Sequence, residues 1–264
     1  MTGKVTGTLI QGGKVMNIQL IRNATVKLEY GGRTLLFDPY LGEKGSGPSY
    51  AGKEKSPVVE LPLALQAILT GVEAVLVSHL HSDHFDEKAR EVLNRETPFF
   101  CQAEEEGLLQ DLGFRDIRPI HQQADWEGIH ITRVPGQHGS GGVLKDMGRA
   151  SGFLLEAPGE PSLYWAGDTV LTENIKKFIK EEQPRIILTH SCGAVWGEGV
   201  LILMDDEQTV EVCRLTPDST VVAIHMEAVD HATVSRHQLR KKGQEQGIRD
   251  EQLLIPQDGE TLHF

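Results

Sequence analysis

The sequence predicts an α/β protein in which sheets are covered on their outside by helices. Three observations indicate this class: an opening stretch in which apolar and polar residues alternate, later apolar runs of strand length, and segments of helical periodicity between those runs. Neither a disordered linker nor a repeat of fixed period divides the 264 residues, so we expect a single domain over residues 1–264.

A β-hairpin is predicted first, within residues 17–38. The segment TVKLEY alternates apolar and polar residues, and Gly31 and Gly32 supply a two-residue turn before the apolar segment LLF. The next segment, residues 39–62, holds glycine and proline at a density that sustains neither helix nor strand. We expect it to form a long surface loop, and such loops in compact proteins often carry function.

Strands and helices are then predicted in alternation. The predicted strands are short apolar runs at residues 73–79, 98–101, 129–134, 151–156, 162–166, 185–189 and 221–225. The predicted helices have helical apolar spacing and are followed by glycine or proline; they cover residues 85–94, 104–112, 172–182, 207–215 and 235–246.

The composition excludes two classes of protein. Hydrophobic residues make up 39% of the chain and charged residues 24%, which is too apolar for a disordered chain. Asp and Glu number 38 against 26 Lys and Arg, and the resulting net charge of -12 repels phosphate backbones. We therefore expect no general nucleic-acid binding.

Cysteine usage and the N-terminal segment predict a cytoplasmic protein. The three cysteines have no close spacing, so they predict neither a disulfide framework nor a zinc knuckle, and they suit a reducing cytosol. The first twenty residues lack the apolar core of a signal peptide, and no apolar run reaches membrane-spanning length. We expect a small-molecule substrate and no membrane partner; a homo-oligomer is compatible with the sequence.

Four potential metal ligands follow the predicted strand at 73–79 within six residues. In the segment SHLHSDHFD, His79 and His81 are two residues apart, so in an extended chain their imidazoles leave the same side. Asp83 and His84 come after the turn and can face a second point nearby. Neutral imidazole and carboxylate suit divalent ions such as zinc, so this spacing predicts two adjacent metal ions.

Three further candidate ligands each follow a predicted strand. His138 lies in the glycine-rich segment VPGQHGSGG, Asp168 lies in YWAGDT, and His225 ends VVAIH. Loops at the C-terminal ends of strands gather at one edge of an α/β sheet, which favours a common site. The alternatives are that His138 is an ordinary loop residue, that Asp168 caps the next helix, and that His225 is a hydrogen-bonded core histidine.

This set of residues resembles the metallo-β-lactamase superfamily of metal-dependent hydrolases. The likeness spans the chain from about Leu20 onward. Its motif is the series His79-x-His81-x-Asp83-His84, followed by His138, Asp168 and a late His225. The segments LLFDPYL and HMEAVDHATVSRHQLR are similar to the branch that includes the L-ascorbate-6-phosphate lactonase-like proteins.

The resemblance implies an αβ/βα sandwich: two mixed sheets face to face with helices outside and the metals at one edge. It also implies one or two divalent ions, zinc first and manganese or iron as alternatives. The implied ligands are His79, His81 and His138 for one ion and Asp83, His84 and His225 for the other, with Asp168 bridging. His231, six residues beyond His225, competes with it as the late ligand.

Such a site predicts hydrolysis of an ester-like, lactone or phosphoester small molecule. Divalent ions lower the pKa of a bound water from 15.7 to about 7, so that hydroxide is available as nucleophile. Asp83 would orient it and receive its proton, and His231 is a candidate donor to the leaving group. Asp38 could bond the outer nitrogen of a ligating imidazole, or simply form an Asp-Pro turn. Arg236 is a candidate contact for a phosphorylated substrate.

Two rival functions stay open on the sequence. One is a metal-binding protein of the same fold without hydrolytic turnover, although a redox member would need cofactor motifs that we do not find. The other is a nuclease. The chain is too short for the inserted nucleic-acid domain of the nuclease members, and its acidic charge agrees with that expectation.

Overall fold

The predicted hairpin is part of a three-stranded antiparallel meander in the computed structural model, which describes residues 16–264. The meander consists of β1 (Asn17–Arg22), β2 (Thr25–Tyr30) and β3 (Arg33–Phe37). The apolar side chains of β2 are buried, while the polar ones between them are partly or fully exposed. Gly31 and Gly32 both have positive φ, 58° and 75°, as the tight turn between β2 and β3 requires.

Part of the expectation about a signal peptide lies outside the described residues, because it rests on residues 1–15 as well as on β1. Within residues 16–264, no helix combines the length and the apolar composition needed to cross a bilayer.

The first sheet is mixed and has seven strands. Its order is β16-β1-β2-β3-β4-β5-β6; strands β16 to β3 are antiparallel neighbours, and β3 to β6 are parallel. β4 is buried along its whole length, as its unbroken apolar sequence predicts for a central parallel strand. The remaining strands of this sheet are β4 (Ala74–Leu76), β5 (Phe99–Gln102), β6 (Ile117–Ile120) and β16 (Thr261–His263).

The second sheet also has seven strands and the same mixed character. Its order is β15-β14-β11-β10-β9-β8-β7, with parallel pairing from β15 to β10 and antiparallel pairing from β10 to β7. Its strands are β7 (Gln123–Trp126), β8 (Ile129–Pro135), β9 (Ser151–Glu156), β10 (Leu163–Trp165), β11 (Ile186–His190), β14 (Thr220–Ile224) and β15 (Leu253–Leu254). A separate ribbon pairs β12 (Val195–Trp196) with β13 (Val200–Leu201).

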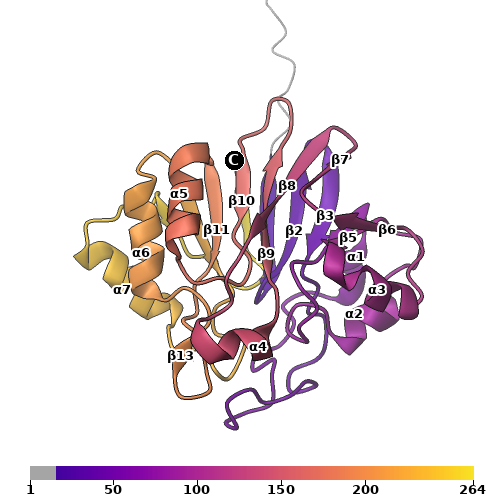
Figure 1. Cartoon of the computed structure of the whole chain (residues 1–264), viewed down its shortest axis with the longest axis horizontal. Helices are drawn as coiled ribbons and strands as arrows, with labels where there is room; N and C mark the ends of the chain where they lie inside the picture. The colour runs from indigo at the N-terminus through magenta and orange to yellow at the C-terminus, as the bar shows by residue number, and fades with distance from the viewer. Residues whose placement is uncertain (1–15) are drawn as a thin grey trace, which may run out of the picture.

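The two sheets pack face to face, and helices cover their outer faces (Figure 1). Phe37 of β3 stacks on Trp165 of β10 across the central core, with ring centroids 4.5 Å apart. The first sheet is covered by α1 (Leu65–Leu69), α2 (Glu87–Val92) and α3 (Glu106–Asp111), and the second by α5 (Glu173–Glu182), α6 (Asp206–Leu215) and α7 (Arg236–Glu245).

The αβ/βα sandwich of two mixed sheets is thereby confirmed. All the predicted strands and helices are present, with ends that differ by a few residues, and residues 39–62 contain neither helix nor strand. The segment after His138 includes a helical turn, η2 (Gly141–Val143), that runs into α4 (Leu144–Met147). In Figure 1, α4 and the long loop lie at the same edge of the sandwich.

Candidate metal centre

The first group of candidate ligands consists of three histidines from two loops. His79 and His81 follow β4, and His138 follows β8. One ring nitrogen of each lies within 4.8 Å of a ring nitrogen of the other two. The ring centroids of His79 and His81 are 4.3 Å apart, and those of His81 and His138 are 5.3 Å apart. The two-residue spacing therefore does bring both imidazoles to one point, where His138 joins them.

The second group consists of Asp83, His84 and His225. His225 follows β14 directly, and its Nε2 lies 3.3 Å from Nε2 of His84 and 3.3 Å from Oδ2 of Asp83. Nε2 of His84 lies 3.8 Å from the same Asp83 oxygen. His225 adopts a left-handed φ of 59°, which is uncommon for a side chain with a Cβ and typical of functional positions.

Asp168 lies between the two groups. Its Oδ2 is 3.2 Å from Nε2 of His84 in the second group, and 3.3 Å and 3.8 Å from Nε2 of His138 and His79 in the first. The alternative that Asp168 caps the following helix is wrong, because Thr172 caps α5 by accepting from the backbone N–H of Ile175. Its carboxylate thus contacts candidate ligands from both groups.

The donor atoms fit metal ions. Two ligands of one tetrahedral zinc ion, each bound at about 2.0–2.1 Å, have donor atoms about 3.3 Å apart. The contacts of His84, His225, Asp83 and Asp168 at 3.2–3.3 Å match this separation. Nε2 of His79 is buried and has no hydrogen-bond partner among residues 16–264. A buried nitrogen without a partner is costly unless a ligand satisfies it.

Hydrogen bonds on the outer nitrogens orient these imidazoles so that Nε2 faces the centre. Nδ1 of His84 lies 2.9 Å from Asp38, and Nδ1 of His138 donates to the carbonyl of Ile202 at 2.8 Å. Nδ1 of His79 lies 3.1 Å from the hydroxyl of Ser78, and Nδ1 of His225 lies 3.5 Å from the thiol of Cys192. A proton on each Nδ1 leaves the lone pair of Nε2 free for a metal, which is the usual arrangement of ligating histidines.

Asp38 supports two of these imidazoles, as the sequence suggested for one. Its Oδ2 lies 2.9 Å from Nδ1 of His84 and accepts from the Ser78 hydroxyl at 2.7 Å, while Oδ1 accepts from the backbone N–H of Ser78. Since the Ser78 proton points to Asp38, the Ser78 oxygen can accept from His79. Asp38 also has a left-handed φ, 40°. The carboxylate therefore fixes the orientation of one candidate ligand directly and of another through a serine.

The electrostatics keep both carboxylates of the centre ionised. Burial alone would raise the pKa of Asp83 and of Asp168. The positive charge of nearby imidazoles, above all that of His84, holds both pKa values well below their usual range. The pKa of His79 and of His81 is lowered, chiefly by burial, so both imidazoles are neutral at pH 7. Ionised carboxylate and neutral imidazole are the forms that bind metals.

His84 and His225 reveal the excess negative charge of the centre. Burial opposes a charge on His84, but Asp168, Asp83 and Asp38 raise its pKa well above the usual value. Burial likewise opposes a charge on His225, but Cys192, Asp168 and Asp83 raise its pKa to about 10. Without metal ions, these two imidazoles are therefore protonated, and their charge balances that of the carboxylates. Bound cations would take over this role.

His190 is part of the centre and was not predicted from the sequence. It ends β11, its Nδ1 contacts Oδ1 of Asp168 at 2.6 Å, and its Nε2 is buried without a hydrogen-bond partner among residues 16–264. Together with His84, Asp168 and His225 it forms a group that could hold a metal ion. The available signal was its position at the end of the buried run IILTH, the same position that singled out His225.

The other two residues weighed from the sequence lie differently. His231 is buried at the edge of the centre, packed against Tyr50 with ring centroids 4.9 Å apart, and burial lowers its pKa. Arg236 is not available to a substrate, because its guanidinium pairs with Glu227 and Asp258.

A cavity of about 190 Å³ opens onto the centre, and we call it the metal cavity. Four candidate ligands line it: His81, His138, Asp83 and Asp168. His231 lines it as well. The remaining wall is formed by side chains from the long loop, the ligand loop, α4 and the segment around β12 and β13: Tyr50, Ser82, Asp146, Met147, Trp196 and Ile202. The volume is below the roughly 300–1,000 Å³ typical of pockets for drug-sized ligands, so a small molecule fits it best.

Comparisons with known proteins agree with this geometry. The family model described as the β-lactamase superfamily domain matches residues 33–226. UPF0173 protein YddR of Bacillus subtilis (strain 168) is 36% identical over 255 residues, which cover 94% of this chain and 100% of that protein.

Two crystal structures are similar over 94% of this chain and 99% of theirs. One is a possible metal-dependent hydrolase from Veillonella parvula DSM 2008, with a TM-score of 0.90 and 32% identity. The other is an isothiocyanate hydrolase from Delia radicum gut bacteria, with a TM-score of 0.88 and 33% identity. The chain therefore belongs to the metallo-β-lactamase superfamily and, within it, to the UPF0173 family of metal-dependent hydrolases.

Proposed function

We propose that this protein hydrolyses a small electrophilic molecule with the help of one or two divalent metal ions. The observation that carries the proposal is the convergence of seven candidate ligands, from loops of both sheets, on one centre, where four of them line a cavity of about 190 Å³. His79, His81 and His138 would hold one ion, Asp83, His84 and His225 the other, and Asp168 would bridge them. Zinc is our first choice of metal, with manganese and iron as alternatives, because imidazole and carboxylate suit all three.

The protein's own residues would contribute orientation and proton transfer. Bound divalent ions supply an acidified water and polarise the electrophile. Asp83, whose low pKa keeps it ionised and which lines the cavity, would accept the proton of the attacking water on its carboxylate. His231, at the cavity wall, would donate a hydrogen bond to the leaving group. Asp38 and Ser78 would keep the imidazoles of His84 and His79 turned toward the ions.

The substrate class is narrowed by the size of the metal cavity and by the relatives. A related crystal structure is that of an isothiocyanate hydrolase, so compounds with the N=C=S group are the first to be tested. The likeness of LLFDPYL and of HMEAVDHATVSRHQLR to the lactonase-like branch adds lactones, and the phosphoester expectation adds phosphodiesters.

We also propose that the enzyme is a single domain and works in the cytoplasm. Both sheets contribute to one central core, which supports a single domain. Cys101, Cys192 and Cys213 are buried free thiols, the state expected in a reducing compartment.

The test is a substrate panel on protein loaded separately with zinc, manganese or iron. We expect hydrolysis of at least one small isothiocyanate, lactone or phosphodiester, its loss on chelation, and its recovery when the metal is restored. His81→Ala, which removes one candidate ligand, should abolish it. A loaded protein that holds its metal but hydrolyses none of these classes would support the metal-binding function without turnover instead.

A further inference from the structure

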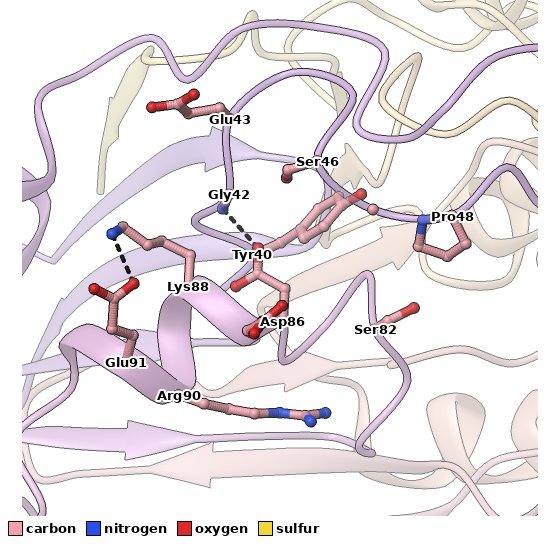
Figure 2. Close-up of a pocket in the computed structure, with 12 residues that line it drawn as sticks. Tyr40, Gly42, Glu43, Ser46, Pro48, Ser82, Asp86, Lys88, Arg90 and Glu91 are labelled. Atoms are coloured by element: carbon pink, nitrogen blue, oxygen red, sulfur yellow. Dashed lines mark hydrogen bonds and ion pairs between the residues drawn. The ribbon is translucent and has the colours of Figure 1, made fainter.

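A second cavity adjoins the metal cavity at one residue. It has a volume of about 480 Å³, and we call it the outer cavity (Figure 2). Ser82, which lies between the candidate ligands His81 and Asp83, is the residue that lines both cavities. Figure 2 shows Ser82 and Pro48 at one end of the outer cavity, with the Lys88–Glu91 ion pair at the other.

The side chain of Tyr50 stands at the junction of the two cavities. It lines the metal cavity, and its hydroxyl forms a 2.7 Å hydrogen bond with the hydroxyl of Ser82. Its ring packs on the other side against His231. Pro48, two residues earlier in the chain, lines the outer cavity. Tyr50 and Ser82 therefore form a partition between a small cavity at the metals and a larger one that leads away from them.

The buried carboxylate of Asp230 fixes the backbone that carries Tyr50. Asp230, the neighbour of His231 in the chain, accepts a hydrogen bond from the hydroxyl of Ser49 and from the backbone N–H of Tyr50, at 2.5 and 2.8 Å. It also accepts from the backbone N–H groups of Ala51, Lys53 and Glu54. So many bonds to one carboxylate fix the backbone that presents Tyr50, and the partition is a built feature of the loop.

The outer cavity has room for part of a longer molecule. Its lining includes Tyr40 and Pro48, whose rings offer apolar surface, and in Figure 2 the Lys88–Glu91 pair of α2 lies farther from Ser82 than these two residues do. The hydroxyl of Tyr40 is buried and has no hydrogen-bond partner among residues 16–264. A tail that entered from the metal cavity would meet this surface first.

We propose that Tyr50 limits how far a substrate extends toward the outer cavity, by closing the metal cavity off from it at Ser82. The inference rests on the proposed function, because it concerns the substrate of the same site. On this side of the metal cavity, a substrate of the native protein ends at Tyr50. Removing the side chain joins the two cavities and admits molecules with an extended tail.

Binding of alkyl hydroxamates tests the inference without knowledge of the natural substrate. Hydroxamates chelate divalent metals, and their tails can be varied in length. We would titrate zinc-loaded protein with acetohydroxamate and octanohydroxamate by calorimetry. Tyr50→Ala should bind octanohydroxamate at least tenfold more tightly than the wild type does, with acetohydroxamate affinity changed by less than threefold.

Two variants separate the partition from a general widening of the site. Tyr50→Phe keeps the ring and loses only the bond to Ser82, so its octanohydroxamate affinity should lie between those of the wild type and Tyr50→Ala. Trp196→Ala enlarges the metal cavity on a wall that the outer cavity does not share, so it should leave the preference for tail length unchanged. Melting curves and zinc content establish that each variant is folded and loaded.

Each outcome decides between the claims. Equal gains in octanohydroxamate affinity for Trp196→Ala and Tyr50→Ala, or no gain for Tyr50→Ala, would overturn the role of Tyr50. If loaded wild-type protein failed to bind even acetohydroxamate, the proposed metal centre itself would be contradicted, and this inference would fall with it. Normal acetohydroxamate binding with an unchanged tail-length preference would contradict the inference alone.

Discussion

The two buried carboxylates of the candidate centre have different surroundings. Asp168 contacts histidines of both ligand groups as well as His190, so its oxygens are surrounded by imidazoles. Asp83 contacts only the second group, through His225 and His84. This difference supports the proposal that Asp83, and not Asp168, exchanges a proton with water in the cavity.

We expect Asp83→Asn to depress turnover far more than it changes KM. The amide keeps the shape and can still hydrogen-bond a water, but it neither accepts a proton nor matches a cation. General-base assistance is worth about 10²–10⁴-fold, so kcat should fall by that order. Steady-state kinetics on the substrate found in the panel, with metal content measured in parallel, check this expectation.

A matched control for this variant is Asp116→Asn, which changes a carboxylate paired with Arg118 on the surface. It should leave both kinetic constants unaltered. Near-normal kcat in Asp83→Asn with full metal content would mean that another group accepts the proton.

Single candidate residues can be picked out of the sequence where they follow a recognisable motif. The series from His79 to His84 falls where two adjacent ligand groups were expected, and Asp38 bonds one of its imidazoles. His190 was not found: it ends a buried strand as His225 does, but no motif surrounds it, and its contact with Asp168 is what places it in the centre. Such contacts between distant loops are not encoded in any short stretch of sequence.

The loop that carries four candidate ligands is held by a neighbouring element at Glu105. Oε1 of Glu105, in η1 (Ala103–Glu105), accepts from the backbone N–H of Leu80, midway between His79 and His81. Gln102 donates to the same oxygen, while Oε2 is buried without a partner among residues 16–264. Burial raises the pKa of Glu105 to about 7, against an ordinary value of 4.5, although both hydrogen bonds act to lower it.

This raised pKa predicts a pH-dependent cost of folding. A carboxyl whose pKa is higher in the folded state stabilises the fold fully below about pH 4.5, and that contribution is lost as the pH rises through 7. Glu105→Gln keeps the acceptor for Leu80 and cannot ionise. Relative to the wild type, the variant should therefore gain stability between pH 5 and pH 8, by at most about 3 kcal/mol.

Urea unfolding of both proteins at pH 5 and pH 8 measures this change. The difference between the two proteins matters, because other groups that titrate in this range contribute equally to both. A constant difference in the free energy of unfolding across that range would show that Glu105 is ionised in the folded protein throughout.

Strands that consist of a continuous apolar run were predicted from the sequence, whereas short strands at the edges of the sheets were not. β4 and β11 are buried runs that need no partner sequence to be recognised. β6 contains a proline, and β7 is mostly polar, so neither shows strand alternation. Both become strands because they lie at the edge of a sheet that their neighbours have already formed.

At the scale of the whole molecule, the candidate centre joins the two sheets. The ligand loop from His79 to His84 leaves the first sheet, whereas His138, Asp168 and His225 follow strands of the second. No single segment of the sequence contains all the candidate ligands. The motif therefore predicted the kind of chemistry, but not how the two sheets come together to form the centre. Because the ligands lie in loops at one edge and not in the central core, their loss should affect metal binding more than folding.

Elemental analysis of the purified protein tests the central claim most directly. We expect one to two divalent metal ions per wild-type chain. In the His79→Ala/His81→Ala double variant the metal content should fall sharply, while a cooperative thermal transition shows that the chain is still folded. A folded double variant with the same metal content as the wild type would contradict the account, because the ions would then be bound somewhere other than this centre.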